Sequence, residues 1–414
     1  MKRIKLIPAL FCMLIIFSSC GYSAPITVIT APPSETASAA PPPPSASPSP
    51  SELPSPPPSA LPSPPPAATP DPLDEYISKM SDRELIGQMV MIGFDGTSDM
   101  DSGRRKLMND YRIGGVFLFG WNTDTFAQTA KLIDKINSRN GGHIPLFIGI
   151  DIEGSVRRFT YDHWRPSLKS AKRLGQLKDP ELVYKQYFQI GTRLKEIGFN
   201  IDFAPVLDIS HNPASTFLNN RMFGSNPEKV SALIRRAING LHDSGIASLG
   251  KHFPGLCDSS ADPHNVLPVI DLTREQIENY SLIPFKAAID EGVDAMMVTH
   301  IMYPDIDRKY ITSASPEFIG AILRGSMGFE GVVFSDDLRM RGFTKKYPVG
   351  KGAVMFILAG GDVALIGKYP KMQKDVCDSI YDALQDGTLT RERLEQSVKR
   401  ILRLKQAYCG FTPQ

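Results

Sequence analysis

The chain has 414 residues, with 46 Lys and Arg against 44 Asp and Glu, which gives a formal net charge of +2 at pH 7. This balance, without a basic stripe carrying interleaved aromatic residues, argues against a nucleic-acid partner. Hydrophobic residues make up 42% of the chain, as in globular proteins, and the five cysteines follow neither zinc-ligand nor disulfide-framework spacing.

The first 20 residues predict an export signal. Three cations among the first five residues precede an apolar run at 6–17, which is too short to span a bilayer as a helix. Phe17-Ser-Ser-Cys20 follows where a cleavage site belongs and resembles a bacterial lipobox, in which the cysteine carries lipid. The resemblance implies a membrane anchor on Cys20, and an ordinary signal peptide with a chance cysteine is the alternative. Either reading predicts an exported protein.

Residues 21–72 are expected to form a disordered linker. They hold more than half of the 35 prolines, mixed with Ser and Ala. Proline cannot donate to helices or sheet ladders. Such a segment favours an extended polyproline II spacer of ~3.1 Å per residue, with a reach on the order of 100 Å. We expect it to hold a folded domain away from the membrane, on the cell-wall side.

The remaining residues, 73–414, are expected to form one α/β domain. Near-continuous apolar runs alternate with amphipathic stretches, which predicts a parallel sheet. Eight runs over this length predict a (β/α)8 TIM-type barrel closed by helices at 370–386 and 389–408, with a doubly wound open sheet as the runner-up. The predicted strands are 87–94, 113–120, 145–152, 199–208, 246–251, 293–300, 331–336 and 362–367.

Titratable residues close most of the predicted strands. They are Asp151, Asp208, His252, His300 and the pair Asp336–Asp337. The carboxyl ends of barrel strands form the face that carries the chemistry in TIM barrels. The pattern therefore predicts an active site at this end of the barrel.

The loop after His252 carries a second chemical signal. Asp262 and His264 are two residues apart, so in an extended segment they point to the same side. The carboxylate can then accept the imidazole N–H and fix its tautomer. His264 suits an acid/base role, and Asp336, at the end of a rigid strand, suits a nucleophile. With Lys251 and Arg221 near the same rim, the set favours cleavage of a sugar substrate.

Several motifs carry the likeness to a known family. They are Lys251-His-Phe-Pro-Gly255 with Asp262-x-His264, Gly331-Val-Val-Phe-Ser-Asp336-Asp-Leu-x-Met340, Phe203-Ala-Pro-Val-Leu-Asp208, Arg221-x-Phe-Gly224 and His300-x-x-Tyr-Pro304. Together they resemble glycoside hydrolase family 3, specifically its bacterial β-N-acetylglucosaminidases, over most of residues 75–408.

That resemblance implies roles for individual residues. Asp336 would form a covalent glycosyl intermediate with retention, and His264 with Asp262 would be the acid/base dyad. The terminal N-acetylglucosamine would be held by Asp151, Arg158, Arg221, Lys251 and His252. No metal or other cofactor is implied, and the protein is expected to be a monomer.

The chain departs from the family pattern in two loops. Asp151-Ile-Glu-Gly-Ser-Val-Arg-Arg158 is one residue shorter than the family's Asp-Gln-Glu-Gly-Gly-Arg-Val-x-Arg, so Arg157 competes with Arg158 for the sugar-binding role. Leu256-Cys257 replaces His-Gly, and Pro263 replaces the serine of the dyad, which predicts a stiffer loop and reduced activity. Glu153 is expected either to brace the sugar-binding loop or to be exposed.

The leading hypothesis is an exported, retaining exo-β-N-acetylglucosaminidase that removes terminal β-linked N-acetylglucosamine from peptidoglycan fragments (muropeptides). A β-N-acetylglucosaminide phosphorylase is an alternative, because a neutral histidine base does not repel phosphate as a carboxylate would. A wall-binding lipoprotein with impaired catalysis is another. A β-glucosidase fits less well, because those family members resemble the Asp336 motif but lack the histidine dyad.

Overall fold

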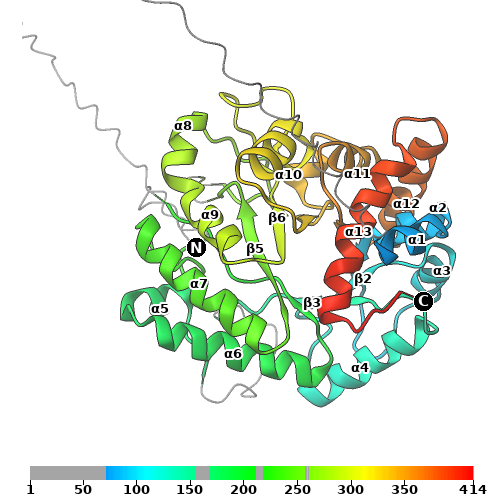
Figure 1. Ribbon diagram of the computed structural model, residues 1–414, viewed down its shortest axis with the longest axis horizontal. Helices are drawn as coiled ribbons and strands as arrows, with labels where there is room; N and C mark the ends of the chain where they lie inside the picture. Colours follow the sequence, from blue (N-terminus) through cyan, green and yellow to red (C-terminus); the bar gives the residue numbers. More distant parts are fainter. Residues whose placement is uncertain (1–70, 155–166, 211–217, 257–258, 260, 414) are drawn as a thin grey trace, which may run out of the picture. The chain divides into compact units, whose positions relative to one another are not determined.

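The computed structural model describes residues 71–154, 167–210, 218–256, 259 and 261–413 (Figure 1). Cys20, Arg158 and Cys257 lie outside these residues, as do the predicted export signal and nearly all of the predicted linker. Within the described ranges, no helix combines the length and the apolar character that crossing a bilayer requires.

Eight parallel strands, joined in chain order, form the centre of the domain. Every strand residue is buried, as expected for a parallel sheet covered on its outer face by helices. The strands are β1 (Val90–Ile92), β2 (Gly115–Phe117), β3 (Phe147–Ile150), β4 (Ile201–Asp202), β5 (Ala247–Phe253), β6 (Ala295–Val298), β7 (Val332–Ser335) and β8 (Ala364–Ile366).

The sheet closes on itself. β8 pairs with β1, and β7 meets β8 through a bridge between Phe334 and Val363. Ser335 N also donates to Val363 O at 2.9 Å. This closure confirms the predicted barrel and excludes the doubly wound sheet, whose two edge strands stay unpaired.

Each predicted strand run overlaps one observed strand, but β5 extends two residues further than predicted and β4 is much shorter. Residues 199–208 yield only the two-residue strand β4. Pro205 has no N–H to donate to a ladder, and only an isolated bridge joins Val206 to Lys251 beyond it.

Aromatic side chains fill the barrel interior. The ring of Phe203 lies 4.8 Å from that of Phe117 and 5.4 Å from that of Phe334, centroid to centroid. Phe147 lies 6.1 Å from Phe334. These tilted and edge-to-face contacts join inward-facing residues of neighbouring and opposite strands into one packed core.

Helices surround the strands, as Figure 1 shows. They are α1 (Pro72–Ser78), α2 (Asp82–Gln88), α3 (Ser102–Tyr111), α4 (Phe126–Arg139), α5 (Ala171–Leu177), α6 (Pro180–Ile197), α7 (Pro227–Asp243), α8 (Arg274–Gln276), α9 (Ile283–Asp290), α10 (Arg341–Thr344), α11 (Val349–Leu358), α12 (Pro370–Gln385) and α13 (Arg391–Tyr408). Two π-helices, η1 (Ile277–Ser281) and η3 (Glu317–Ser326), and the 3-10 turn η2 (Thr312–Ala314) complete the set.

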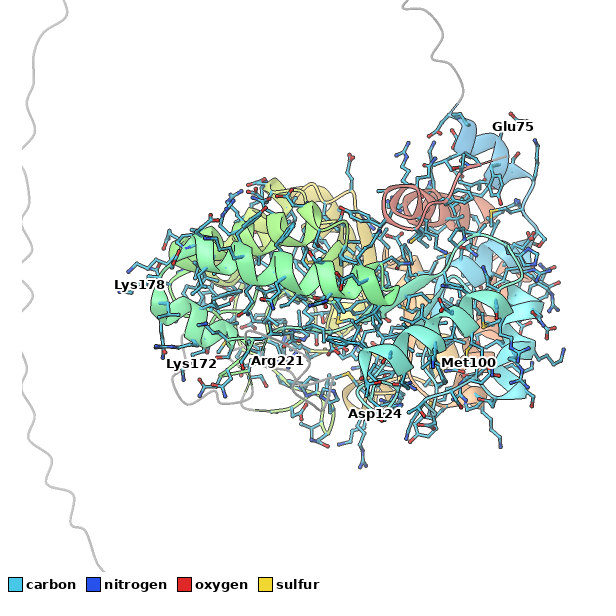
Figure 2. The ribbon with its side chains drawn as sticks, turned by 90° about the horizontal axis from the view of Figure 1, so that it is seen from below. Glu75, Met100, Asp124, Lys172, Lys178 and Arg221 are labelled. Carbon is cyan, nitrogen blue, oxygen red and sulfur yellow. The ribbon has the colours of Figure 1, made fainter. Side chains whose placement is uncertain are left out.

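Local sequence signals set several helix starts. Ser81 and Glu84 form the expected capping box of α2, in which each side chain bonds the other residue's backbone N–H. Thr125 caps α4 in a similar way, by accepting from the N–H of Gln128. Charged side chains such as Glu75 and Lys178 project outward from the helical layer (Figure 2).

The first and last helices of the described chain are joined by ion pairs. Asp71, which caps α1, lies 2.9 Å from Arg403 Nη2 and 3.1 Å from Lys399 Nζ. Lys399 also contacts Asp74 at 2.5 Å. These pairs fix α1 to the outer face of α13.

Candidate active site

A cavity of about 220 Å³ opens at the carboxyl ends of the strands. Six of the eight residues predicted for catalysis and sugar binding line it, so the fold brings these six together. Asp262 is not among the lining residues but contacts His264, and Arg158 lies outside the described residues. The lining residues are Phe117, Phe119, Asp151, Phe203, Arg221, Lys251, His252, Leu256, Pro263, His264, Met297, Asp336, Asp337, Arg339 and Leu365.

Glu153 holds the two cations of the cavity wall. Its carboxylate accepts from Arg221 Nε at 2.6 Å and Nη2 at 2.8 Å, and lies 2.6 Å from Lys251 Nζ. Burial alone would raise the pKa of Glu153, but Lys251 and Arg221 hold it well below its usual range. The side chain is only 1% exposed. The expectation of an exposed Glu153 is therefore wrong, and its contacts are those of a brace.

Asp208 fixes the orientation of His252. Asp208 Oδ2 accepts from the backbone N–H of His252 at 2.9 Å and lies 2.7 Å from His252 Nδ1. Because Nδ1 directs its proton to Asp208, Nε2 is left to accept from Arg221 Nη2 at 3.2 Å, an assignment made from these partners. Arg221 is thus held by Glu153 on one side and His252 on the other.

Asp262 and His264 are in contact, as predicted. Asp262 Oδ1 accepts from the backbone N–H of His264 at 2.9 Å and lies 2.8 Å from His264 Nδ1. The His264 side chain is 63% exposed. The bond from Nδ1 to the carboxylate fixes the tautomer and the orientation of the imidazole ring.

The loop that carries this pair is docked on α10. Pro263 O accepts from Gly342 N at 3.0 Å, and His264 O accepts from Arg341 N at 3.4 Å. A Cβ atom on Gly342 would lie 2.9 Å from both Pro263 O and Val266 O. The bare glycine therefore permits this close approach, which sets the position of His264.

Asp336 follows β7 directly. Its backbone N–H donates to Val298 O at 2.9 Å, and its Oδ1 accepts from Asp337 N at 2.8 Å. Burial raises the pKa of Asp336, but His300, His252 and His264 outweigh it and lower that pKa below its ordinary value. The carboxylate is thus ionised at neutral pH.

The side chain of Asp337, which also lines the cavity, is bonded to other partners than the side chain of Asp336. Its Oδ1 accepts from the backbone N–H groups of Arg339 at 3.1 Å and Gly367 at 3.0 Å. Its Oδ2 accepts from Arg339 Nε at 2.5 Å. These bonds give Asp337 a positioning role for Arg339 and the segment after β8.

Sequence reasoning missed Phe119 and Arg339, which also line the cavity. Phe119 comes two residues after β2 and Arg339 four residues after β7. The rule that found Asp336 considered only titratable groups at the strand ends themselves. Extending it to aromatic and cationic residues a few positions further would have found both.

Neither a metal-ligand cluster nor a reactive thiol is found at the site among the described residues. Among the residues described, no three His, Cys, Asp or Glu side chains gather in the manner of metal ligands. Cys377 is fully buried in α12, away from the cavity lining, and burial raises the pKa of its thiol well above the ordinary value.

A family model described as "Glycosyl hydrolase family 3 N terminal domain" matches residues 82–404. A beta-hexosaminidase of Thiobacillus denitrificans is 34% identical over 295 residues, which are 69% of this chain and 80% of that protein. A beta-hexosaminidase of Bordetella avium is 31% identical over 328 residues, or 78% of this chain and 89% of that protein.

Solved structures give the same likeness. A glycoside hydrolase family 3 beta-N-acetylglucosaminidase from Paenibacillus superposes with a TM-score of 0.76 at 36% identity, covering 80% of this chain. The match spans 63% of the Paenibacillus chain, so that enzyme is considerably longer. A beta-N-acetylhexosaminidase from Beutenbergia cavernae superposes with a TM-score of 0.74 at 25% identity, covering 79% of this chain and 99% of the other.

Proposed function

This chain belongs to glycosyl hydrolase family 3, and from that membership we propose a retaining exo-β-N-acetylglucosaminidase in which Asp336 and His264 carry out the chemistry. The enzyme is a glycoside hydrolase of the β-N-acetylhexosaminidase type, acting on a carbohydrate. One observation carries the residue assignment. A carboxylate held ionised and a histidine bonded through Nδ1 to an aspartate line the same small cavity.

In the first step, the Asp336 carboxylate attacks the anomeric carbon as the glycosidic C–O bond breaks. His264 Nε2 gives its proton to the leaving oxygen, which departs as an alcohol. Asp262, on Nδ1, stabilises the imidazolium that donates this proton. The product is a covalent glycosyl ester on Asp336.

In the second step, the now neutral His264 takes a proton from water. The oxygen of that water attacks the anomeric carbon and releases the Asp336 carboxylate. Two displacements at one carbon restore the original configuration. The sugar is proposed to be held by Asp151, Arg221, Lys251 and His252, and by Arg158 from outside the described residues.

The size of the cavity favours removal of one sugar at a time. At about 220 Å³ it is smaller than the roughly 300–1,000 Å³ pockets that bury drug-sized ligands. Its walls leave room for a single ring. We therefore propose exo action, with terminal β-linked N-acetylglucosamine of peptidoglycan fragments as the substrate.

Location is a separate part of the proposal. Residues 1–20 as an export signal, Cys20 as a lipid attachment site and 21–72 as a spacer would place the enzyme on the outer side of the membrane. Metabolic labelling with a radioactive fatty acid tests this, because Cys20→Ser should abolish incorporation. Label retained in that variant would contradict the anchor.

The chemistry is tested by hydrolysis of a 4-nitrophenyl β-N-acetylglucosaminide. Asp336→Ala should lower kcat by roughly 10³-fold or more, because the covalent route is lost. Added azide should restore turnover of this variant and yield the α-glycosyl azide. Asp271→Ala, at an exposed aspartate, is the matched control. Full activity of Asp336→Ala would refute the assignment.

The acid role of His264 needs a second comparison. His264→Ala should slow hydrolysis of a methyl glycoside about 10²–10⁴-fold, but a 4-nitrophenyl glycoside much less, since nitrophenolate leaves without a proton. His143→Ala, at an exposed histidine, should slow neither. Equal losses on both substrates would show that His264 is not the acid.

The exposed His264 also keeps phosphorolysis open, because a neutral imidazole admits an anionic acceptor. The same assay with phosphate decides between the two acceptors. Unchanged rates and free N-acetylglucosamine as product support the hydrolase. A phosphate-dependent rate with a sugar 1-phosphate product would establish the phosphorylase. Sugar binding without turnover would indicate the impaired wall-binding protein.

A further inference from the structure

Three aromatic side chains are linked by contacts, one of them in the cavity wall and two of them exposed. Phe119 lines the cavity, and the ring of Trp121 stacks on it with 4.4 Å between centroids and 9° between planes. Phe119 and Trp121 follow β2, and Tyr369 follows β8. β1 lies between these two strands in the barrel. Trp121 is 42% exposed and Tyr369 49% exposed. We name Phe119, Trp121 and Tyr369 the aromatic rim.

Two cations contact the aromatic rim, and one of them, Arg339, lines the cavity. The Arg339 guanidinium lies 5.6 Å from the ring centroids of both Phe119 and Tyr369. Lys368 Nζ lies 5.2 Å from the Trp121 ring. Arg339 is itself bonded to Asp337, the neighbour of the proposed nucleophile. The rim is therefore continuous with the reacting centre.

The Trp121 side of the rim is held in place by the chain after β1. Trp121 Nε1 donates to Phe94 O at 2.9 Å. The next residue, Asn122, donates to Phe94 O at 3.1 Å and to Gly96 O at 2.7 Å. The indole N–H of Trp121 and the side chain of Asn122 therefore bond to the same carbonyl oxygen, which fixes the orientation of the exposed Trp121 ring.

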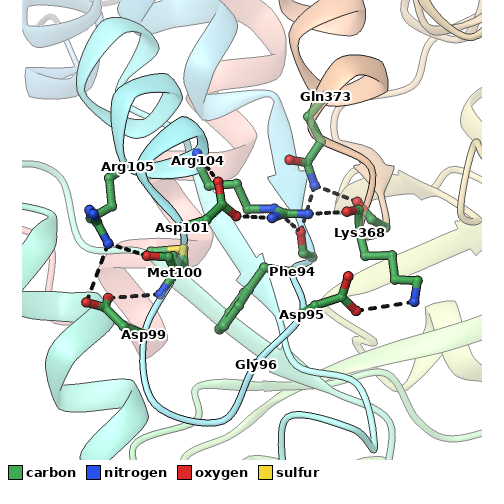
Figure 3. A network of polar contacts seen from close by, with 12 residues as sticks. Phe94, Asp95, Gly96, Asp99, Met100, Asp101, Arg104, Arg105, Lys368 and Gln373 are labelled. Carbon is green, nitrogen blue, oxygen red and sulfur yellow. Dashed lines mark hydrogen bonds and ion pairs between the residues drawn. The ribbon is translucent and has the colours of Figure 1, made fainter.

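Lys368, which precedes Tyr369 in the chain, is held through Arg104, as Figure 3 shows. Arg104, which is 4% exposed, donates from Nε to Gly93 O at 3.1 Å and from Nη2 to Lys368 O. Gln373 donates to Gly93 O at 2.7 Å. Asp95 contacts Lys368 Nζ at 3.2 Å. The segments after β1, β2 and β8 therefore form one preorganised surface.

From this surface we propose that the aromatic rim binds the second pyranose ring of the substrate, the one that leaves with the glycosidic oxygen. The inference rests on the proposed function and deepens it. A pyranose has a face of C–H groups that packs on the electron-rich face of an aromatic ring, and hydroxyls at its edge that accept from Lys368 and Arg339. The cavity has room for one ring, so the next ring lies outside it.

Rigid aromatic side chains suit this task. They lose little conformational entropy on binding. The hydrogen bonds of Trp121 and of the Lys368 backbone already restrict the motion of the rim before a ligand binds. The rim makes the enzyme select glycosides whose leaving group is itself a sugar. A glycoside with a very small leaving group would not reach it.

The test compares two substrates, N,N′-diacetylchitobiose and methyl β-N-acetylglucosaminide. Trp121→Ala should lower kcat/KM for the disaccharide about tenfold, mainly by raising KM. The kcat/KM of this variant for the methyl glycoside should stay within about twofold of the wild-type value. Tyr369→Ala should act in the same direction and changes no hydrogen bond of the rim. Phe188→Ala, at an aromatic 39% exposed on α6, is the matched control and should change neither value.

Equal losses on both substrates in both rim variants would overturn the proposal, since they would indicate damage to the cavity. An unchanged disaccharide value would overturn it as well. If the wild-type chain cleaves neither substrate, the proposed function fails but the rim is still tested by calorimetry. Trp121→Ala should then weaken binding of diacetylchitobiose about tenfold while that of N-acetylglucosamine stays the same.

Discussion

At the scale of single residues, Glu153 controls the charge of the cavity. It is the shared acceptor of Arg221 and Lys251 and the nearest counter-charge of Lys251, since Asp151 lies further away, at 3.9 Å from Lys251 Nζ. The cost of an unpaired buried charge is much larger than the value of a surface ion pair. Both the stability of the domain and the aim of the sugar-binding cations therefore depend on one carboxylate.

Glu153→Gln should lower the free energy of unfolding by about 3 kcal/mol, because the amide keeps the shape but leaves the buried Lys251 and the partly buried Arg221 without their nearest counter-charge. KM for the sugar should rise as Arg221 loses its fixed position. Urea denaturation and steady-state kinetics measure the two effects.

The control for this substitution is Glu181→Gln, which breaks the exposed pair with Arg236. That change should cost less than about 1 kcal/mol. Comparable losses of stability in the two variants would contradict the bracing role of Glu153.

At the scale of elements, the loop that carries Asp262 and His264, the dyad loop, is positioned by its contact with α10. This contact consists of two backbone hydrogen bonds, and it is close because Gly342 has no side chain. Because α10 begins a few residues after Asp336, one short segment positions both the proposed nucleophile and the proposed acid. Movement of the loop therefore changes the distance between the two groups.

Gly342→Ala should push the loop outward and lower kcat by about 10–100-fold, as displacements near 1 Å do at catalytic groups. The melting temperature should change little, because the dyad loop buries little surface. Gly320→Ala in η3, where the new Cβ would meet only Ala359 O at 3.6 Å, is the control. A Gly342→Ala variant with wild-type kcat would show that the loop tolerates displacement.

The positions of the strands and of some helix starts were predictable from sequence, because they depend on the pattern of apolar and capping residues along a short stretch of chain. Near-continuous apolar runs gave all eight strands, and the capping box gave the start of α2. The shortness of β4 could have been read from Pro205, which cannot donate to a ladder. The π-helical turns of η1 and η3 were not predictable, since they depend on how neighbouring segments meet.

Part of the site was predictable, because residues at the carboxyl ends of neighbouring strands lie on the same face of a barrel. That rule found Asp151, His252 and Asp336. It did not find the burial of Glu153, because its partner Arg221 lies 68 residues further along the chain. It did not find Trp121 either, since an aromatic after a strand usually belongs to the core.

At the scale of the whole molecule, one buried amine lies where the last helix meets the barrel. Lys405 of α13 is fully buried, and its Nζ donates to Gln88 Oε1 at 2.7 Å and Gly114 O at 2.8 Å. Burial lowers the pKa of Lys405 to about 7. The group links α13, α2 and the residue that precedes β2.

Lys405 should make the stability of the domain depend on pH. Between its folded pKa of about 7 and the ordinary value of 10.5, the unfolded chain holds a proton that the folded chain has lost. The free energy of unfolding therefore rises with pH in this window, by up to about 1.4 kcal/mol per pH unit from this group. Denaturation at pH 7.5, 8.5 and 9.5 should show a smaller rise in Lys405→Met.

The exposed Lys106→Met serves as control and should follow the wild-type curve. If the wild-type and Lys405→Met curves run parallel, Lys405 keeps its ordinary proton affinity and the prediction is wrong.

The ion pairs between α1 and α13 have a mechanical consequence. Any pull on the chain before Asp71 reaches first the contacts of Asp71 and Asp74 with Lys399 and Arg403. The force runs into the last helix and the outer layer of the domain before it reaches any strand. If the proposed anchor and spacer carry load, α1 should detach from α13 before the strands and the cavity at their carboxyl ends are disturbed.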